Sequence, residues 1–380
     1  MSQWDAIVVG AGPAGSWAAQ YMAARGRSVL ILERDRFPRN KTCAGWLNRK
    51  ALEEFEELAQ CANTFVESAF YGVIFHSASG GRTAQYREDR PTGYLVRRDK
   101  FDAALLQIAV DAGATCLQQA NFEAVDSTGS KVVVRLSDGS AHEASALIGA
   151  DGVNGVTGRL TGLNPAWDSS SLVVCSNEDV PLYGSIIDSI YGQGRERYIH
   201  LWPAYEMIPG YAWAFPKAER VAVGLGGRAG GTKNIHILHE GFCKLLKESA
   251  LLPPSAECGH AQYGTITAGG AHRLATHVRG PVVLVGDAGG FAAGATGEGI
   301  YHALWTGRCA ARLIDEGLER GNIAASLAQF DALWKENIGS SVEVPSGASL
   351  VTLLSLLFTS RKVAERVARA YLFGDPFTLF

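Results

Sequence analysis

Several features that mark other protein classes are missing from this sequence. No apolar run approaches the roughly 18 to 20 residues that a membrane-spanning helix needs, and internal repeats and low-complexity tracts are absent. No basic block stands out in a chain whose formal net charge is −3, which argues against nucleic acid as a partner. The first residues are typical of a strand rather than of a charged segment followed by an apolar one, so we expect no signal peptide.

Cysteine is scarce and irregularly placed. The seven cysteines lie at positions 43, 61, 116, 175, 243, 258 and 309, an odd number without any CxxC pair. This pattern predicts a reducing cytoplasmic environment and neither a disulfide framework nor a zinc site. The length of 380 residues exceeds the usual single hydrophobic core, so we expect two or three domains.

What the sequence does contain is a strand, a glycine-rich turn and a helix near its start. Residues 6–9 are an apolar run typical of a buried parallel strand, and the sequence GAGPAG follows. Gly10 permits a tight turn, Gly12 lets backbone approach a pyrophosphate, and Gly15 lets a helix pack closely on the strand. That helix is expected over residues 16–25, and its first N–H groups favour negative charge, so the stretch predicts a dinucleotide site.

A second apolar strand, residues 29–32, ends in Glu33, about 20 residues beyond the glycines. A carboxylate there can accept both hydroxyl groups of an adenosine ribose and disfavours a 2′-phosphate, so FAD or NAD fits better than NADP. A glycine motif alone is weak evidence because ordinary strand, turn and helix units also carry it. Here the strand, the helix and the acidic residue are all present.

The segment at residues 34–46 is polar and basic, and we expect a long loop on the cofactor side. It contains Cys43, Ala44 and Gly45, which are small enough for backbone to lie against a flat ring. Cys43 can equally be plain filler, because a free cysteine behaves as a small hydrophobe. An amphipathic helix is expected over residues 47–58.

A second sheet is indicated by β-like runs at residues 65–94 and 172–227, the latter including an expected strand at 189–191. One strand of this sheet carries three aromatic residues that strict alternation places on one face. These are Tyr211, Trp213 and Phe215. Such a row forms either a binding wall or ordinary core.

Three polar residues follow predicted strands or begin predicted helices. Arg98 opens a helix, where a guanidinium can meet phosphate or a ring carbonyl or simply face water. Asp151 follows a strand in the sequence GADG and can cap the next helix or face phosphates. Asp287 ends the apolar strand at residues 282–285, where a carboxylate can take a polyol hydroxyl. The helix expected from Thr296 can stabilise negative charge on a reduced flavin.

Together these motifs resemble those of the FAD-dependent oxidoreductases that include aromatic hydroxylases, flavin halogenases and geranylgeranyl reductases, over residues 1 to about 315. The spacing Pro38-x-x-Lys41-x-Cys43-x-Gly45 and the sequence YAWAFPK at 211–217 are similar to the geranylgeranyl reductase branch. In that branch the cysteine lies beside the flavin and the aromatic motif lines a prenyl pocket. This chain departs from the branch in having CAG for the usual CGG and no proline soon after GDAGG, and it lacks the halogenase WxWxIP sequence.

The resemblance implies FAD as the cofactor and a role for each matching residue. The residues implied to hold FAD are Gly10, Gly12, Ala14, Gly15, Glu33, Arg34, Ala44, Gly45, Arg98, Asp151, Asp287, Gly297, Gly299 and Ile300. The residues implied to bind substrate are Tyr211, Trp213 and Phe215. Cys43, or a water that it positions, is the candidate proton donor, and no metal is expected.

We therefore expect an α/β fold with a Rossmann-type FAD-binding domain, a β-sheet substrate domain with an apolar pocket, and a helical C-terminal segment. The expected bounds are 1–64, 93–165 and 270–320 for the FAD-binding domain, 65–92 and 166–269 for the substrate domain, and 321–380 for the helical segment. The expected activity is reduction of C=C bonds in a prenyl or other hydrophobic substrate, with NAD(P)H, ferredoxin or a flavin reductase as electron donor. The alternatives are an oxygen-activating hydroxylase or halogenase, and a flavin-binding protein without catalysis.

An apolar run at residues 348–358 precedes four basic residues near the end of the chain. It is too short to span a bilayer. It is expected either to pack on the FAD-binding domain or to lie on a membrane surface, with the basic side chains near anionic headgroups. The basic residues are Arg361, Lys362, Arg366 and Arg369. Peripheral membrane contact of a cytoplasmic protein is therefore a hypothesis drawn from the sequence.

Overall fold

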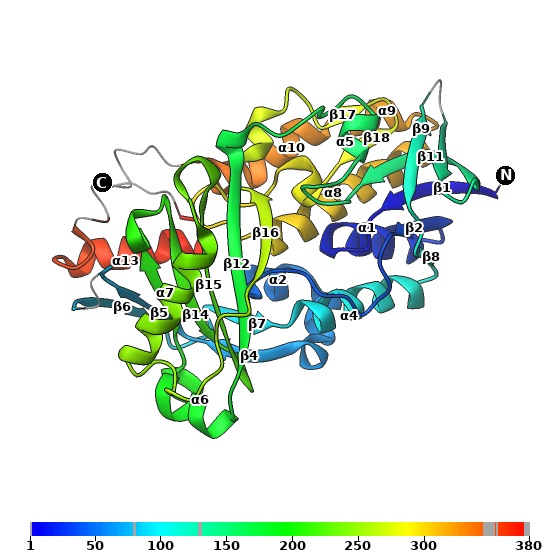
Figure 1. The fold of residues 1–380 in the computed structure, drawn as a ribbon. Helices are drawn as coiled ribbons and strands as arrows, with labels where there is room; N and C mark the ends of the chain where they lie inside the picture. The colour runs from blue at the N-terminus through cyan, green and yellow to red at the C-terminus, as the bar shows by residue number, and fades with distance from the viewer. Residues whose placement is uncertain (1, 79–80, 128–130, 345–353, 355, 376–380) are drawn as a thin grey trace. The chain divides into compact units, whose positions relative to one another are not determined.

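The chain divides into two compact units, each made of three separated segments (Figure 1). The computed structural model describes residues 2–78, 81–127, 131–344, 354 and 356–375. Unit 1 comprises Met1–Asn40, Asp99–Asp168 and Thr267–Glu343, and unit 2 comprises Lys41–Arg98, Ser169–Ile266 and Val344–Phe380. Each unit has its own sheet and its own core, and each is described by itself.

Unit 1 is built on an eight-stranded, largely parallel sheet. Its strands are β1 (Ser2–Val9), β2 (Val29–Glu33), β8 (Thr115–Gln118), β9 (Phe122–Asp126), β10 (Val132–Leu136), β11 (Ala141–Gly149), β17 (Val278–Arg279) and β18 (Val282–Leu284). The main path runs β17-β18-β11-β1-β2-β8; β10 pairs antiparallel with β11, and β9 pairs antiparallel with β10. The apolar run at the start of the chain lies in the middle of this sheet, because β1 pairs in parallel with both β11 and β2.

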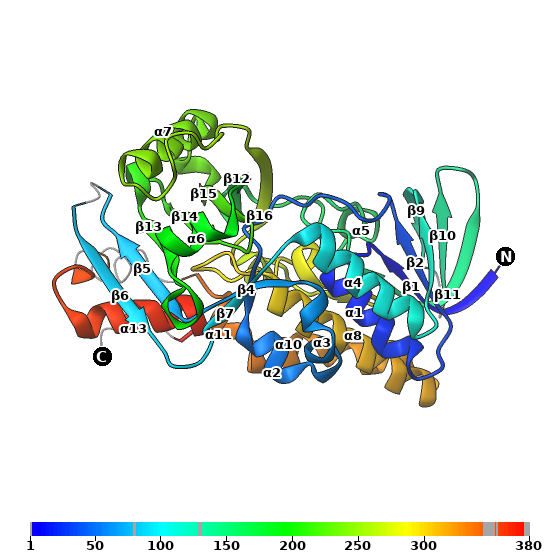
Figure 2. The same cartoon turned by 90° about the horizontal axis from the view of Figure 1, so that it is seen from below.

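The helices of unit 1 pack on this sheet and on one another. They are α1 (Pro13–Ala23), α4 (Arg98–Asp111), α5 (Thr157–Leu160), α8 (Ile300–Glu319), α9 (Ile323–Leu327), α10 (Phe330–Asn337) and α11 (Gly339–Val342). Helices α1 and α8 lie side by side in both views (Figures 1 and 2). Their close approach requires glycine at position 307, where a Cβ would stand 2.2 Å from the carbonyl oxygen of Ala14. Helix α1 begins at Pro13, earlier than expected, because proline suits the first helical position.

Unit 2 contains a seven-stranded and a three-stranded sheet. Its strands are β3 (Trp46–Asn48), β4 (Val66–Phe70), β5 (Gly72–His76), β6 (Thr83–Arg87), β7 (Gly93–Val96), β12 (Leu172–Pro181), β13 (Ile199–Pro203), β14 (Gly210–Pro216), β15 (Arg220–Arg228) and β16 (Gln262–Thr267). The large sheet has the order β16-β12-β15-β14-β13-β5-β6 and the small one the order β3-β7-β4. The α/β fold class and the second β-rich region are thus confirmed.

Two helices of unit 2 cover opposite faces of the large sheet. The helices of this unit are α2 (Arg49–Glu54), α3 (Glu56–Gln60), α6 (Gly184–Tyr191), α7 (Ile235–Glu248) and α13 (Arg361–Phe373). Figure 2 shows α7 on one side of the strands and α13 on the other. The core under α7 includes Phe242 and Leu246, and the core under α13 includes Val367 and Tyr371. Strand β14 serves both cores, because its successive side chains alternate between the two faces.

Three expectations about local structure are wrong. Residues 189–191 are the end of α6 rather than a strand, because Ile187 and Tyr191 recur at helical spacing and are buried. The single helix expected over residues 47–58 is instead β3 followed by α2 and α3, separated by Phe55 in an extended conformation. Cys243 and Cys258 form a disulfide, with their Cα atoms 6.0 Å apart, although their spacing resembles no disulfide motif.

The bounds of the two units differ from the expected domain bounds at several places. Residues 41–64 group with unit 2, because β3 pairs with β7 in the small sheet. Residues 321–343 group with unit 1, because α9 and α10 pack on α8. Most of the apolar run at 348–358 lies outside the described residues. Within the described part of the chain, no helix has the length and apolar character that crossing a membrane requires.

Candidate active site

The turn between β1 and α1 contains two glycines that admit no side chain and one that does. Gly10 has a φ of +99°, and a Cβ there would lie 2.5 Å from the carbonyl oxygen of Ala150. A Cβ at Gly15 would lie 1.9 Å from the carbonyl oxygen of Gly10. At Gly12 the nearest neighbour would be a guanidinium nitrogen of Arg39, at 3.7 Å. Gly10 and Gly15 therefore fix the shape of the turn, and Gly12 leaves backbone open to a ligand.

The N-terminus of α1 suits an anion. Its N-cap is Gly12, Pro13 follows, and the first turn contains no acidic residue. The first N–H groups of a helix have no partner within it, and the helix dipole favours negative charge at this end. The geometry therefore fits a pyrophosphate placed over Gly12.

Glu33 ends β2 as expected and is 4% exposed. Its Oε2 accepts the N–H of Ala11 at 2.8 Å, and its Oε1 accepts the N–H of Asp35 at 2.9 Å. Each carboxylate oxygen has two acceptor positions, so each keeps one for a ribose hydroxyl. Glu33 thus shapes the glycine turn as well as being placed for ribose. The side chain of Arg34 is 64% exposed and lies 3.8 Å from the carboxylate of Asp35.

Arg39 lies at the same turn, although the sequence analysis gave it no role. Its Nη1 is 3.1 Å from Oδ2 of Asp102, a fully buried residue of α4, and its Nη2 faces Gly12. A guanidinium held by a buried carboxylate is oriented before any ligand binds, and its planar fork matches phosphate oxygens. The available signal is the group of arginines in the loop after the acidic end of a Rossmann strand, but that group also contains Arg34 and Arg36 and does not single out Arg39.

Asp151 follows β11 and caps the start of α5, the first of the two roles considered for it. Its Oδ2 accepts the N–H groups of Val156 and Thr157, at 2.7 and 2.9 Å, and also the hydroxyl of Thr157. Its Oδ1 is buried and has no hydrogen-bond partner among the described residues. Burial raises the pKa of Asp151, although these hydrogen bonds oppose the rise. A hydroxyl from a ligand or water at Oδ1 would satisfy it, and Gly10 is its close neighbour.

Asp287 lies at the end of β18, in a short 3-10 turn, Gly286–Gly289. Its Oδ1 is 3.4 Å from the position of a Cβ at Gly299, the N-cap of α8. A carboxylate acceptor and a helix N-terminus therefore lie together, as a polyol and a reduced flavin ring require. Gly286, which precedes Asp287, packs closely against α1. A Cβ at Gly286 would lie 3.0 Å from the Cβ of Ala14.

Two buried histidines support this end of unit 1. His277 donates from Nε2 to the carbonyl oxygen of Gly289 at 2.9 Å, and its Nδ1 lies 2.7 Å from Oδ1 of Asp331. His302 pairs through Nδ1 with Glu298 at 3.1 Å. Glu298 also accepts the N–H of Tyr301 at 2.9 Å, so it caps the first turn of α8. Sequence reasoning missed these pairs because their members lie in different segments or were treated only as part of the glycine-rich motif.

Unit 2 contains the segment around Cys43. The N–H of Gly45 donates to Cys43 Sγ at 3.3 Å, which fixes the position of the sulfur. Gly45 has a φ of +82°, and a Cβ there would lie 2.0 Å from the carbonyl oxygen of Val96. The Nζ atom of Lys217 would be 3.2 Å from the same Cβ, and it bonds to Asp179 at 2.8 Å. Lys217 is 1% exposed, so a buried cation lies next to this turn. Sequence reasoning gave neither Lys217 nor Asp179 a role.

The three aromatic residues of β14 share one face, as alternation predicts. Trp213 and Phe215 are buried in one cluster with Trp46, whose ring meets that of Phe215 edge-on at a centroid distance of 6.2 Å. Tyr211 is half-buried at the border of this cluster and contacts Tyr371 of α13. The cluster also adjoins Ala44. Trp213 and Phe215 therefore have a core role, and Tyr211 is the most accessible of the three.

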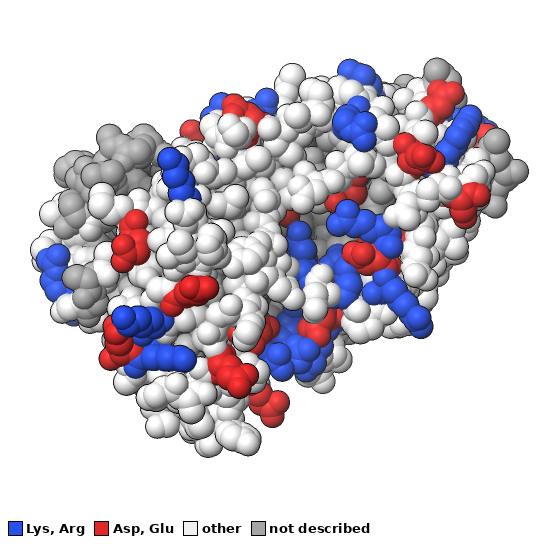
Figure 3. Space-filling model, viewed as in Figure 1, with Lys and Arg blue, Asp and Glu red and all other residues white. Residues whose placement is uncertain are grey.

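The site residues expected from the sequence fall into two groups. Unit 1 holds Gly10, Gly12, Ala14, Gly15, Glu33, Arg34, Asp151, Asp287, Gly297, Gly299 and Ile300. Unit 2 holds Cys43, Ala44, Gly45, Arg98, Tyr211, Trp213 and Phe215, and Arg98 is the first residue of α4. On the face shown in Figure 3, basic and acidic side chains are interspersed.

Comparisons with known proteins identify the family. The FAD binding domain family matches residues 3–216. Digeranylgeranylglycerophospholipid reductase 1 of Methanopyrus kandleri is 32% identical over 90% of this chain and 88% of that protein. Menaquinone reductase of Mycolicibacterium smegmatis is 30% identical over 96% of this chain and 88% of that protein.

Solved structures share the fold. A geranylgeranyl bacteriochlorophyll reductase-like protein of Thermoplasma acidophilum matches with a TM-score of 0.81 and 22% identity, over 99% of this chain and 98% of that one. The flavin-dependent brominase Bmp2 matches with a TM-score of 0.72 and 18% identity, over 99% and 95% of the two chains. At these identities the structures show the fold alone.

Proposed function

The chain belongs to the FAD-dependent oxidoreductases of the geranylgeranyl reductase family, and from this premise we propose that it reduces carbon–carbon double bonds of a prenyl or other hydrophobic substrate. FAD is the cofactor, and when bound it supplies the hydride equivalent. The two curated relatives are named for a digeranylgeranyl lipid and for menaquinone, which supports a lipid-like substrate class. An external electron donor is part of the proposal.

The arrangement of unit 2 around Cys43 carries the proposal. An isolated alkene is apolar and unpolarised, so its reduction requires an apolar contact surface and one proton besides the hydride. The aromatic cluster of unit 2 adjoins Ala44, and the thiol of Cys43 lies at the same turn. Buried Lys217 adds a cation beside this turn. We propose that Cys43 delivers the proton, directly or through a water.

The residues of unit 1 would hold FAD without chemical steps of their own. Glu33 would accept the ribose hydroxyls, and the α1 N-terminus with Arg39 would bind the pyrophosphate. Asp287 and the N-terminus of α8 would meet the polyol chain and the ring. The open backbone at Gly12 and the unpartnered Oδ1 of Asp151 support this fit.

A test of the reaction class is whether the reduced enzyme consumes oxygen as product forms. We expect saturated product to form under anaerobic conditions from chemically reduced holoenzyme and a geranylgeranyl lipid. Product that appears only with oxygen, in one-to-one proportion, would instead establish the alternative, a hydroxylase or halogenase. The likeness to a brominase supports that alternative by fold only.

Cys43→Ser tests the proton donor. We expect FAD content and the flavin spectrum to be unchanged and turnover to fall about 10²-fold or more, as for removal of a general acid. Cys61→Ser is the matched control, because Cys61 is a partly exposed free cysteine at the end of α3. Equal turnover in both variants would make Cys43 a packing residue.

We also propose that the protein contacts a membrane surface through α13. The residues Arg361, Lys362 and Arg366 are exposed, whereas Ala364 and Val367 are buried. Basic side chains on an exposed helix face attract anionic headgroups by about 1 kcal/mol each. Co-sedimentation with anionic vesicles should weaken with salt and in Arg361→Glu/Lys362→Glu, but not in Arg195→Glu, an exposed control. A protein that ignores anionic vesicles at low salt would contradict this proposal.

A further inference from the structure

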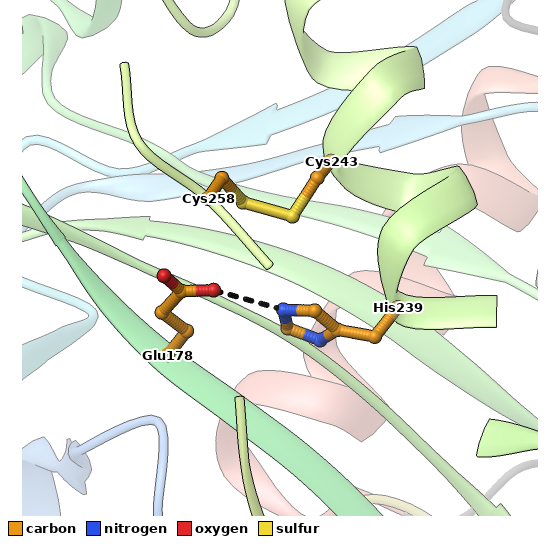
Figure 4. Close-up of side chains that lie close together, drawn as sticks. All are labelled: Glu178, His239, Cys243 and Cys258. Carbon is orange, nitrogen blue, oxygen red and sulfur yellow. Dashed lines mark hydrogen bonds and ion pairs between the residues drawn. A yellow bond between two sulfur atoms is a disulfide. The ribbon is translucent and has the colours of Figure 1, made fainter. Parts of the chain in front are cut away.

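Four side chains with metal-ligating atoms lie together in unit 2, apart from the residues implied for FAD or substrate (Figure 4). Glu178 comes from β12, His239 and Cys243 from α7, and Cys258 from the segment before β16. Their nearest oxygen, nitrogen and sulfur atoms are all within 4.8 Å of one another. Three separated stretches of chain therefore bring one carboxylate, one imidazole and two sulfurs to a single point.

The placement of His239 is that of a metal ligand. It lies four residues before Cys243 on α7, so both side chains leave the same face of the helix. His239 is 1% exposed, and its Nδ1 is 3.0 Å from the hydroxyl of Ser176. That contact leaves Nε2 directed at the cluster, where it lies 3.2 Å from Glu178. Metal-bound histidines characteristically have their second ring nitrogen held in this way.

Glu178 is fixed by backbone as well. Its Oε2 accepts the N–H of Gly259 at 2.8 Å and that of His260 at 3.0 Å. These two residues directly follow Cys258, so the carboxylate holds the cysteine-bearing segment against β12. Glu178 is only 10% exposed. Both non-sulfur donors are therefore oriented by neighbours whatever the state of the two sulfurs.

We propose that Glu178, His239, Cys243 and Cys258 form a structural Zn²⁺ site when the cysteines are reduced, and that the disulfide replaces the metal when they are oxidised. A mixed set of thiolate, imidazole and carboxylate ligands, all supplied by protein, is typical of closed tetrahedral zinc. Zn–S bonds of about 2.3 Å and Zn–N or Zn–O bonds of about 2.0 Å place ligand atoms some 3.3 to 3.8 Å apart, within the spacing observed here. The two sulfurs must separate from their bonded distance, and ligand atoms that now lie up to 4.8 Å apart must approach one another.

The two states carry the same charge. With the disulfide formed, the neutral imidazole and one carboxylate give a net charge of −1. With zinc bound, the charge of +2 and two added thiolates give −1 again. Because burying extra charge is costly, two states of equal charge can share this largely buried place. Reduced cysteines without metal would lose both the covalent link and the coordination bonds.

The conversion between the disulfide and the zinc site balances in atoms and electrons. A trialkylphosphine and water reduce the Cys243–Cys258 bond to two thiols and give the phosphine oxide. Zinc binding then releases the two thiol protons. A small-molecule disulfide reverses the change: the two bound thiolates give up one electron each to form the S–S bond, the oxidant becomes two thiolates, and Zn²⁺ leaves as the aqueous ion.

The experiment measures zinc retained by the FAD-loaded protein. Holoenzyme treated anaerobically with phosphine, given one equivalent of Zn²⁺ and desalted should retain close to one zinc per chain, and untreated holoenzyme close to none. Co²⁺ in place of zinc should produce thiolate-to-cobalt absorption in a difference spectrum against the same holoenzyme. Zinc should be released on adding a small-molecule disulfide.

Matched variants separate this site from adventitious binding. His239→Gln and Cys258→Ser should lose the zinc, and Ser176→Ala should weaken its affinity about 10-fold. His236→Gln, on an exposed position of the same helix, and Cys61→Ser should behave as wild type. FAD content reports folding in each variant, and Glu178→Gln replaces any variant that loses FAD. Absence of zinc from the reduced protein, or equal zinc in His239→Gln and His236→Gln, would overturn the proposal.

Discussion

The two units differ in which part of the chain carries their candidate chemistry. In unit 1 the candidate ligand-binding features are mainly backbone: a glycine turn, two helix N-termini and carboxylates that are themselves bonded to N–H groups. In unit 2 they are side chains, namely an aromatic cluster, a thiol and a buried ion pair. Backbone features depend on a few glycines that allow no replacement, whereas side-chain features depend on packing across many positions.

The ligands proposed for the two units, a cofactor and a substrate, differ in a corresponding way. A dinucleotide presents the same phosphates and ribose to every protein that binds it, so one backbone arrangement can bind it in many proteins. A hydrophobic substrate has no such constant groups, and a cluster of aromatic residues can be rearranged to suit it. The names of the two relatives, a digeranylgeranylglycerophospholipid reductase and a menaquinone reductase, refer to different molecules.

The largest expected effect concerns Gly15, compared with Gly12. Gly15→Ala would place a Cβ 1.9 Å from the carbonyl oxygen of Gly10, so we expect loss of bound FAD and about 3 kcal/mol or more of stability, the upper end for overpacking. In Gly12→Ala the nearest neighbour of the new Cβ is a guanidinium nitrogen of Arg39 at 3.7 Å, an ordinary van der Waals distance, so this variant should fold normally. It should bind FAD about tenfold more weakly, since the Cβ points where a phosphate approaches. FAD content and thermal unfolding measure both effects.

If this prediction failed, the contrast between backbone features in unit 1 and side-chain features in unit 2 would no longer hold. Equal FAD content and equal melting temperatures for Gly15→Ala and Gly12→Ala would mean that the turn tolerates side chains. The cofactor would then be held by side chains in unit 1 as well.

A somewhat smaller effect is expected for the buried ion pair of unit 2. Lys217→Met leaves the Asp179 carboxylate without its cation, and removing one partner of a buried pair costs about 3 to 5 kcal/mol. Because Asp179 is 29% exposed, we expect about 2 to 3 kcal/mol in denaturant unfolding. Lys217→Met/Asp179→Asn should recover most of this loss, because it removes the unpaired charge. A double variant no more stable than the single one would show that Lys217 acts by its packing.

The smallest expected effect concerns a charged side chain in unit 1. It therefore tests how much a side chain contributes in the unit whose candidate site is mainly backbone. Burial alone would raise the pKa of Asp331, but hydrogen bonds from His277, Thr276 and Trp334 hold it well below its usual range. A depressed folded-state pKa stabilises the protein above the unfolded value, near pH 4, and this stability is lost as pH falls toward the folded value. We expect Asp331→Asn to cost about 1 to 2 kcal/mol at pH 7.

The difference between Asp331→Asn and wild type should shrink progressively below about pH 4. Asp89→Asn, a substitution at an 87% exposed carboxylate, should leave the stability profile unchanged. A difference that stays constant down to pH 2 would show that Asp331 contributes as a neutral hydrogen-bonding group instead.

The features that could be predicted from the sequence are mostly the glycine turn and the strand-end acids of unit 1. The β1 turn, Glu33, Asp151 and Asp287 were predictable, because glycine spacing and strand-end acids have local causes. Residues 189–191, the end of α6, were expected to be a strand because so short a run does not reveal a period, and the helical spacing of Ile187 and Tyr191 appears only over a longer stretch. Sequence patterns are sufficient for prediction where residues close together along the chain are also close together in space.

The rest could not be predicted because it depends on long-range contacts. Arg39 meets Asp102, Lys217 meets Asp179, and His277 meets Asp331, and nothing in the spacing of these residues indicates the pairs. The Cys243–Cys258 disulfide could not be predicted for the same reason, since α7 and the following segment must fold back before the sulfurs meet. The family resemblance supplied roles for motif residues but not for the residues that orient them.

The interleaving of the two units has a consequence for protein engineering. The chain passes from one unit to the other five times, at residues 40/41, 98/99, 168/169, 266/267 and 343/344. No single cut therefore yields either unit as a continuous fragment, and a truncated gene would encode parts of both. Exchange of unit 2 between relatives requires three grafted segments rather than one. For the substrate role proposed for unit 2, single substitutions are therefore a simpler experiment than domain exchange.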